Sequence, residues 1–152
     1  MSAENNPREG MSLIVKTITR LVASFILLFG IYIVLYGHVT PGGGFAGGVI
    51  VACSLILMLL AFGKKFVFGF VSEKAPTIWD CLGAVAFLLI AVAGYFGGGF
   101  FVNLFSKGTP FTLFSGGTIP LCNIAIGVKV GAGLFGIFLA LSVFRISWKG
   151  KV

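Results

Sequence analysis

The sequence predicts an all-α integral membrane protein with four transmembrane helices and with both termini in the cytoplasm. Hydrophobic residues make up 58% of the 152 residues and charged residues only 10%, whereas soluble domains average about 45–50% and 25%. The mean hydropathy is +1.10. A chain of this length has room for about four spans of roughly 20 apolar residues and for no separate soluble domain.

The four expected spans form a plain four-helix bundle. They lie within a membrane domain of residues 12–148 and cover about residues 13–36, 45–63, 78–102 and 120–144. The first carries Lys16 and Arg20 one turn apart, where long basic side chains can snorkel toward headgroups. The third opens with Thr77 as its expected N-cap and Asp80 at its third position, close to a capping box.

Basic residues lie mainly on one side of this membrane domain. Nine of the 11 lie before or within the first turns of the first helix, between the second and third helices, or after the fourth. By the positive-inside rule these segments are cytoplasmic, so residues 38–44 and 103–119, with Lys107, face outward. Residues 1–11 and 149–152 are expected to be cytoplasmic tails, the first of them mobile. The net charge of +7 thus indicates membrane orientation, and no nucleic-acid partner is expected.

Residues 37–48 form the densest local signal. Pro41 is expected in the first turn of the second helix with Thr40 as its cap. Gly43/Gly47 and Gly44/Gly48 have the GxxxG spacing of packed transmembrane helices. One interpretation is a tight outer hairpin packed on a neighbour, and the other is backbone exposed to ions or water beside a cavity. The motif residues are Thr40, Pro41, Gly42, Gly43, Gly44, Phe45, Gly47 and Gly48.

Two titratable side chains are candidates for an ion or proton path. Lys129 lies about nine residues into the fourth expected helix, where a cation is costly unless it is paired or hydrated. Small residues share its helical face, so Lys129 is expected to face protein, in an ion path or in a structural pair with a carboxylate. His38, the only histidine, can handle protons near neutral pH, or it can simply lie at the interface. Asn123 is expected to bond a neighbouring helix.

The acidic residues argue against a self-sufficient transporter. Three glutamates lie in aqueous segments and Asp80 lies at a helix start, so no carboxylate is expected deep in the membrane. The sequence contains no nucleophile triad, phosphate loop or iron–sulfur cysteine set, and its three cysteines are far apart. We therefore expect a small non-catalytic subunit, without cofactor or metal, that docks on larger partners through glycine-rich faces.

One long motif resembles a known family. The GH-x-x-PGGGF-x-GG signature of the MnhB family, whose members belong to Mrp-type sodium/proton antiporters, is similar to Gly37-His38-Val39-Thr40-Pro41-Gly42-Gly43-Gly44-Phe45-Ala46-Gly47-Gly48. Residues 120–134 resemble the family's last helix, so the resemblance covers about residues 13–145. It implies an accessory subunit of the cell membrane, in a stand-alone antiporter or in the ion-translocating arm of a membrane-bound hydrogenase or sulfur-reducing complex.

The implied partners are other membrane subunits, including hydrogenase-like ones, with Na⁺ and H⁺ as transported ions and the bilayer as surroundings. On this hypothesis the Gly43/Gly47 and Lys129 faces pack against partner helices and help to form an ion passage. Two alternatives stay open. A homodimeric four-helix exporter would need a membrane-embedded carboxylate, and a structural membrane protein would tolerate apolar replacement of Lys129 and His38.

Overall fold

The computed structural model describes residues 11–69, 71–72, 74–103 and 115–149. Residues 1–10 and 150–152 of the expected tails, and Lys107 in the outward segment, lie outside the described residues. The helices are α1 (Leu13–Tyr36), α2 (Gly44–Phe62), α3 (Lys64–Phe68), α4 (Ala75–Ala93), the 3₁₀ turn η1 (Gly94–Gly97) and α5 (Ile119–Lys149).

Four of these helices are long and apolar enough to cross a membrane. The spans cover Leu13–Tyr36, Gly44–Phe62, Ala75–Gly97 and Ile119–Ser142, with mean hydropathies between 2.0 and 2.6. Each has 19 or more residues, and about 20 residues at 1.5 Å per residue match the hydrocarbon thickness. The prediction of an all-α membrane protein with four spans is therefore confirmed.

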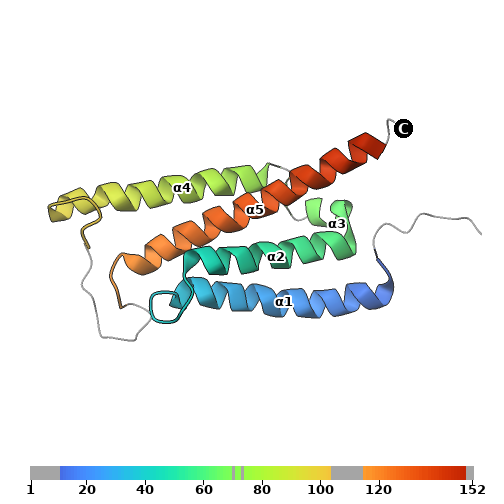
Figure 1. Ribbon diagram of the computed structural model, residues 1–152, viewed down its shortest axis with the longest axis horizontal. Helices are drawn as coiled ribbons and strands as arrows, with labels where there is room; N and C mark the ends of the chain where they lie inside the picture. The colour runs from blue at the N-terminus through green and yellow to red at the C-terminus, as the bar shows by residue number, and fades with distance from the viewer. Residues whose placement is uncertain (1–10, 70, 73, 104–114, 150–152) are drawn as a thin grey trace, which may run out of the picture.

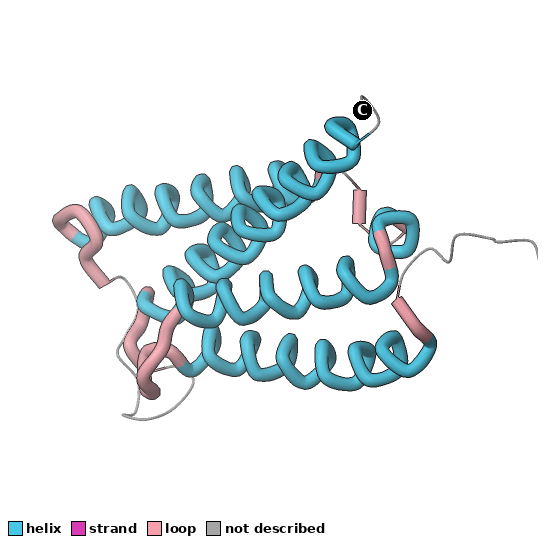
Figure 2. The backbone as a smooth tube through the Cα atoms, turned by 45° about the vertical axis from the view of Figure 1, so that its right-hand side comes forward, coloured by secondary structure: helices cyan, strands magenta, loops and turns pink. Residues whose placement is uncertain are grey.

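The four helices of the expected bundle stand in a row, and among the residues that the structure describes the two outer helices, α1 and α4, do not contact each other. The order across the row is α1, α2, α5, α4 (Figures 1 and 2). Within the described residues, α4 packs against α5 but not against α1 or α2. In the spans of the two middle helices, 33% and 28% of residues are buried, against 17% in each outer one. Much apolar surface of the row is therefore not covered by the described residues.

A small apolar core lies where α2 ends, at the end of the molecule that also holds the start of α1 and the end of α5 (Figure 1). It consists of Leu59, Val67, Phe135 and Leu139, with further apolar side chains of α2, α3 and α5 around it. The short helix α3, which the sequence analysis missed, closes this end by packing back against α2 (Figure 1). The start of α1 and the end of α5 lie at this same end, as an even number of spans requires (Figure 1).

The bounds of α4 correct the sequence prediction at both ends. The helix starts at Ala75, so Lys74 and not Thr77 is the N-cap residue. Pro76 lies in the first turn, where a missing N–H costs no helical hydrogen bond. The helix ends at Ala93 and not near residue 102, because the chain folds back after η1. Gly98 takes a left-handed φ of 99°, and the Phe101 N–H donates to the Ala91 carbonyl at 3.4 Å.

Candidate functional site

The glycine-rich turn joins the end of α1 to the start of α2, at the opposite end of these helices from the apolar core (Figure 1). Gly42 and Gly43 have φ values of 148° and 112°, a region open to glycine and strained for other residues. Because these two residues turn the chain, α2 begins only at Gly44. Thr40 therefore does not cap α2. Its hydroxyl donates to the Tyr36 carbonyl at 3.0 Å and extends the end of α1, and Pro41 is exposed in the turn.

The helical glycines of the motif bring α2 close to two neighbours within this chain. A Cβ on Gly48 would lie 2.7 Å from the Gly127 carbonyl oxygen of α5. A Cβ on Gly47 would lie 2.8 Å from the backbone nitrogen of Val34 in α1. Small residues allow this backbone contact, which drives helix association in membranes. The Gly47 face is thus buried on α1 and is not available to a partner subunit, contrary to the hypothesis from the sequence.

Asn123 lies in the first turns of α5 beside the start of α2. A Cβ on Gly44 would lie 2.9 Å from the Asn123 Cα atom, and a Cβ on Gly43 would lie 3.8 Å from its Oδ1 atom. Asn123 therefore contacts the neighbouring helix. Its Nδ2 atom is buried and has no hydrogen-bond partner within the described part of the chain, so the expected bond to that helix stays a prediction.

His38 lies in the glycine-rich turn between α1 and α2, and it is partly buried. A Cβ on Gly116 would lie 3.5 Å from the His38 Cδ2 atom, which places the imidazole beside the segment that leads into α5. Asn103 ties this segment together, because its Oδ1 atom accepts a hydrogen bond from the Thr118 N–H at 3.0 Å. Lys129 is ten residues beyond the first residue of α5, about 15 Å along the helix. His38 and Lys129 therefore occupy different depths.

Lys129 forms an ion pair with Asp80 inside the spans. The Lys129 Nζ atom lies 2.8 Å from the Asp80 Oδ1 atom and donates a hydrogen bond to it. Gly83 makes this approach possible, since a Cβ there would lie 2.8 Å from the Cβ of Lys129. Gly133 of α5 lies beside the Asp80 carboxylate: a Cβ built on Gly133 would lie 3.6 Å from the Asp80 Oδ1 atom. Helices α4 and α5 thus pack closely at Gly83 and Gly133, and the ion pair links their side chains.

Asp80, the partner of Lys129, is the residue of this candidate site that the sequence analysis missed. It is the sixth residue of α4, within the span Ala75–Gly97, and its carboxylate lies 2.8 Å from the Lys129 ammonium, which belongs to the middle of the span Ile119–Ser142. The sequence analysis expected no carboxylate at that depth. The signal was present in the sequence: Lys129 is a cation inside an apolar run, and Asp80 is the one acid that adjoins another such run. A mid-membrane cation requires a partner, and the nearest carboxylate in any span was the candidate.

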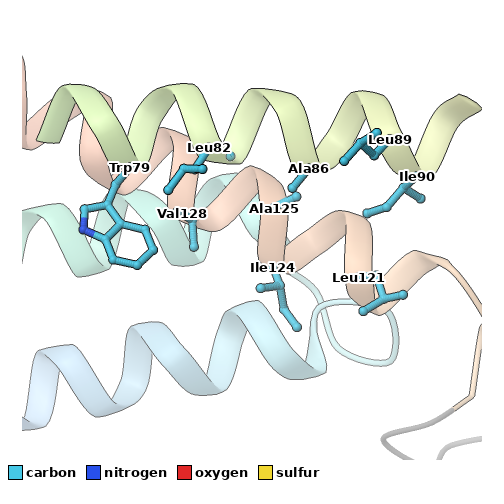
Figure 3. Close-up of a pocket in the computed structure, with 10 residues that line it drawn as sticks. Trp79, Leu82, Ala86, Leu89, Ile90, Leu121, Ile124, Ala125 and Val128 are labelled. Carbon is cyan, nitrogen blue, oxygen red and sulfur yellow. The ribbon is translucent and has the colours of Figure 1, made fainter. Parts of the chain in front are cut away.

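The ion pair faces outward as well as inward. Lys129 and Asp80 keep 48% and 37% of their side-chain surface exposed, so the expectation that Lys129 faces protein holds for its stem on α4 only. Beside the pair is a hollow of about 260 Å³, lined also by Phe45 of the glycine-rich motif and by apolar residues of α5. A second hollow of about 440 Å³ lies along α4 and α5 and is lined by apolar side chains (Figure 3).

Comparisons with known proteins agree with this architecture. Residues 14–136 match the family described as "Domain related to MnhB subunit of Na+/H+ antiporter". The chain is 36% identical to a Na(+)/H(+) antiporter subunit of Bacillus subtilis, over 93% of this chain and 92% of that protein. It is 38% identical to the uncharacterized protein MJ1307 of Methanocaldococcus jannaschii, over 88% of this chain and 53% of that protein.

A solved structure is similar in fold and in sequence. It is a chain of the membrane-bound sulfane sulfur reductase, an archaeal respiratory membrane complex, with a TM-score of 0.71 and 34% identity. The match covers 86% of this chain and 60% of that chain, so this chain spans little more than half of two of its relatives. The family match nevertheless covers most of the residues, including the glycine-rich turn and Lys129. The chain is therefore a multi-pass membrane protein that belongs to the MnhB family of antiporter subunits.

Proposed function

We propose that this chain is an accessory membrane subunit of a multi-subunit sodium/proton antiporter module of the Mrp type. The observation that carries this proposal is the open row of four helices, whose outer helices bury 17% of their spans and leave both sides to other proteins or lipid. The likeness to a Bacillus subtilis antiporter subunit over nearly the full length of both chains supports it. The partners are other membrane subunits, and the chain itself is not catalytic.

The module is either a stand-alone antiporter or the ion-translocating arm of a respiratory complex. The likeness to a chain of an archaeal sulfur reductase complex supports the second host. In either host, we place both termini in the cytoplasm and the glycine-rich turn on the outer side, because the basic residues flank the end of the row where α1 starts and α5 ends.

We further propose that Lys129 and His38 lie beside the ion or proton passage, with Na⁺ and H⁺ as the transported ions. Lys129 lies mid-span with Asp80 and is half exposed, so it faces whatever lies next to the α4–α5 side of the row. His38 lies at the outer end. A homodimeric exporter is the weaker function, because Asp80 is already neutralised by Lys129 and has no spare charge for a cationic substrate.

Isolation of the tagged protein in a gentle detergent, followed by mass spectrometry, tests the proposal. Recovery of antiporter subunits alone supports a stand-alone exchanger, and iron–sulfur or hydrogenase-like subunits in the same particle support a respiratory complex. Recovery of the chain with only copies of itself overturns the accessory-subunit proposal.

The place of Lys129 is tested by Lys129→Ala in the assembled module. We expect sodium-dependent proton transport in membrane vesicles to fall at least tenfold, or the module to lose subunits, because Asp80 is left as an unpaired charge. Lys74→Ala is the matched control, since Lys74 is exposed and precedes α4. Unchanged assembly and transport with Lys129→Ala would remove Lys129 from the passage.

A further inference from the structure

We propose that the side of the α4–α5 seam that carries Asp80 and Lys129 is the docking surface for a transmembrane helix of another subunit, and that this helix presents a neutral hydrogen-bonding side chain, a hydroxyl or a carboxamide, to the ion pair. The inference rests on the proposed function, because it requires a multi-subunit module. It goes further by naming the face of the chain that is covered and the chemistry that covers it.

The first step is the cost of the exposed pair. An ammonium has three donors and a carboxylate has about four acceptor sites, and the bond between Lys129 Nζ and Asp80 Oδ1 uses one of each. Both side chains are more than one third exposed within spans that cross the hydrocarbon. Lipid tails offer no hydrogen bonds, so exposed polar atoms at this depth are stable only beside protein or water.

The second step is the shape of the neighbouring surface. The hollow beside the pair has a volume of about 260 Å³, and its other walls include Phe45, Leu134 and Ile137. Phe45 and Ile137 are exposed to 67% and 60%. Gly133 adds no side chain at the centre of this surface. An apolar rim around one polar centre is suited to a helix that is apolar except for one polar residue.

The third step is the charge of the group that fits. The pair is neutral, so a second carboxylate or a second cation would leave one net charge enclosed in the membrane, which is costly. A hydroxyl or a carboxamide can accept from Lys129 and donate to Asp80 without adding charge. The neutrality of the pair therefore favours a Ser, Thr, Tyr, Asn or Gln on the partner helix.

The opposite side of the same seam serves as an internal control. Val128 lines the larger hollow of Figure 3, and Ile137 lines the smaller one, nine residues further along α5. Nine residues correspond to two and a half helical turns, so the two side chains leave α5 in opposite directions. Apart from the indole N–H of Trp79, the lining of the larger hollow is apolar (Figure 3), with Leu89 63% exposed, and it is compatible with lipid tails.

The first experiment is photo-crosslinking in the intact complex in native membranes. A benzophenone amino acid replaces Ile137 or Phe45 on the proposed surface, or Leu89 on the opposite side. We expect Ile137 and Phe45 to crosslink to the same second subunit, with at least tenfold more product than Leu89 gives with that subunit. Crosslinks from Ile137 and Phe45 to lipid only, or to a second copy of this chain, would overturn the proposal.

The second experiment removes the charges without leaving one unpaired. In the double variant Asp80→Leu with Lys129→Met, a pair that merely links α4 to α5 in lipid is replaced by apolar side chains, and subunit recovery should be unchanged. A docked polar group would instead lose its partners. We expect normal amounts of the variant chain in the membrane but at least a tenfold loss of the crosslinked subunit on purification.

The outcomes separate this inference from the proposed function. If the wild-type chain purifies without other subunits, the proposed function fails and the inference fails with it. If the wild-type chain purifies with its partners and the double variant retains all of them, only the docking surface is refuted. Exchange of the two charges, Asp80→Lys with Lys129→Asp, keeps a neutral pair, and we expect it to restore more of the partner than the apolar double variant does.

Discussion

Helix α5 packs closely against α2 on one side and α4 on the other, and these two contacts are the α2–α5 seam and the α4–α5 seam. Small residues allow both contacts, but the residues differ. At the first, Gly48 of α2 lies against Gly127 of α5, and backbone meets backbone along an uncharged contact. At the second, Gly83 of α4 lies against the stem of Lys129, and the contact ends in a half-exposed ion pair. The α2–α5 contact leaves no charged group exposed at Gly48 and Gly127. The second leaves polar atoms for something outside the chain, which is why a partner is expected there.

The largest expected effect comes from replacing a glycine of the α2–α5 contact by a larger residue. In Gly48→Val the new Cβ would lie 2.7 Å from the Gly127 carbonyl oxygen and 3.0 Å from the Val130 Cβ atom. Overpacking costs about 1–3 kcal/mol, and more where backbone atoms must move, so we expect little folded protein. Thermal unfolding of the purified chain in detergent measures this effect.

Gly133→Ala is the control for this change, because its Cβ would meet nothing closer than 3.6 Å. Alanine is favoured over glycine in a helix by about 1 kcal/mol, so the chain should unfold at the same or a higher temperature. Equal melting temperatures for Gly48→Val and the wild type would show that the first seam is not close-packed.

The second seam should fail more locally. In Gly83→Val the new Cβ would lie 2.8 Å from the Cβ of Lys129, and α4 can move away because it packs against α5 alone among the described spanning helices. We expect a cost of about 1–3 kcal/mol and a longer distance between α4 and α5, measured between spin labels at positions 88 and 137 in a cysteine-free background.

Labels at positions 25 and 60, on α1 and α2, serve as the reference for that experiment. Their separation should stay at its wild-type value if the second seam opens alone. If both distances lengthen together, the two seams are one cooperative unit, and the contrast between them disappears.

The smallest expected effect concerns a polar contact between α1 and α2. The Ser54 hydroxyl, fully buried, donates to the Ala23 carbonyl at 2.8 Å. Interhelical hydrogen bonds in membranes contribute about 0.6 kcal/mol on average, so Ser54→Ala should lower stability by roughly that amount. Ser24→Ala is the matched control, because Ser24 is exposed and bonds the Arg20 carbonyl of its own helix. Equal effects of the two variants would contradict an interhelical role for Ser54.

The sequence was sufficient for the spans and for the family. Apolar run length alone locates helices that must satisfy their own backbone hydrogen bonds in lipid, and the expected and observed bounds of α1 agree. The start of α4 was not predictable from capping rules, since no side chain caps that helix in the structure. The bent end of α4 depends on a left-handed glycine and a returning hydrogen bond, which hydropathy does not register.

The order of the helices and the ion pair lay beyond the sequence for a related reason. Hydropathy gives the length of each helix but not its neighbour, so a row and a closed bundle have the same pattern. Lys129 was recognised as a mid-membrane cation, but its partner is 49 residues away in the chain. Asp80 was the one acid beside another apolar run, but without the order α2, α5, α4 the sequence did not show that the two side chains meet. The functional roles of Lys129, His38 and Asn123 stay predictions.

The place of α5 in the row also has a consequence for synthesis. Helix α5 follows α4 in the chain but lies between α2 and α4, so among the described helices α4 has no spanning neighbour until α5 is made. The 49 residues between Asp80 and Lys129 take about 2–10 s to translate at roughly 5–20 residues per second. During that interval Asp80 is already made and its lysine is not, so the row of four helices is complete only when α5 enters the membrane.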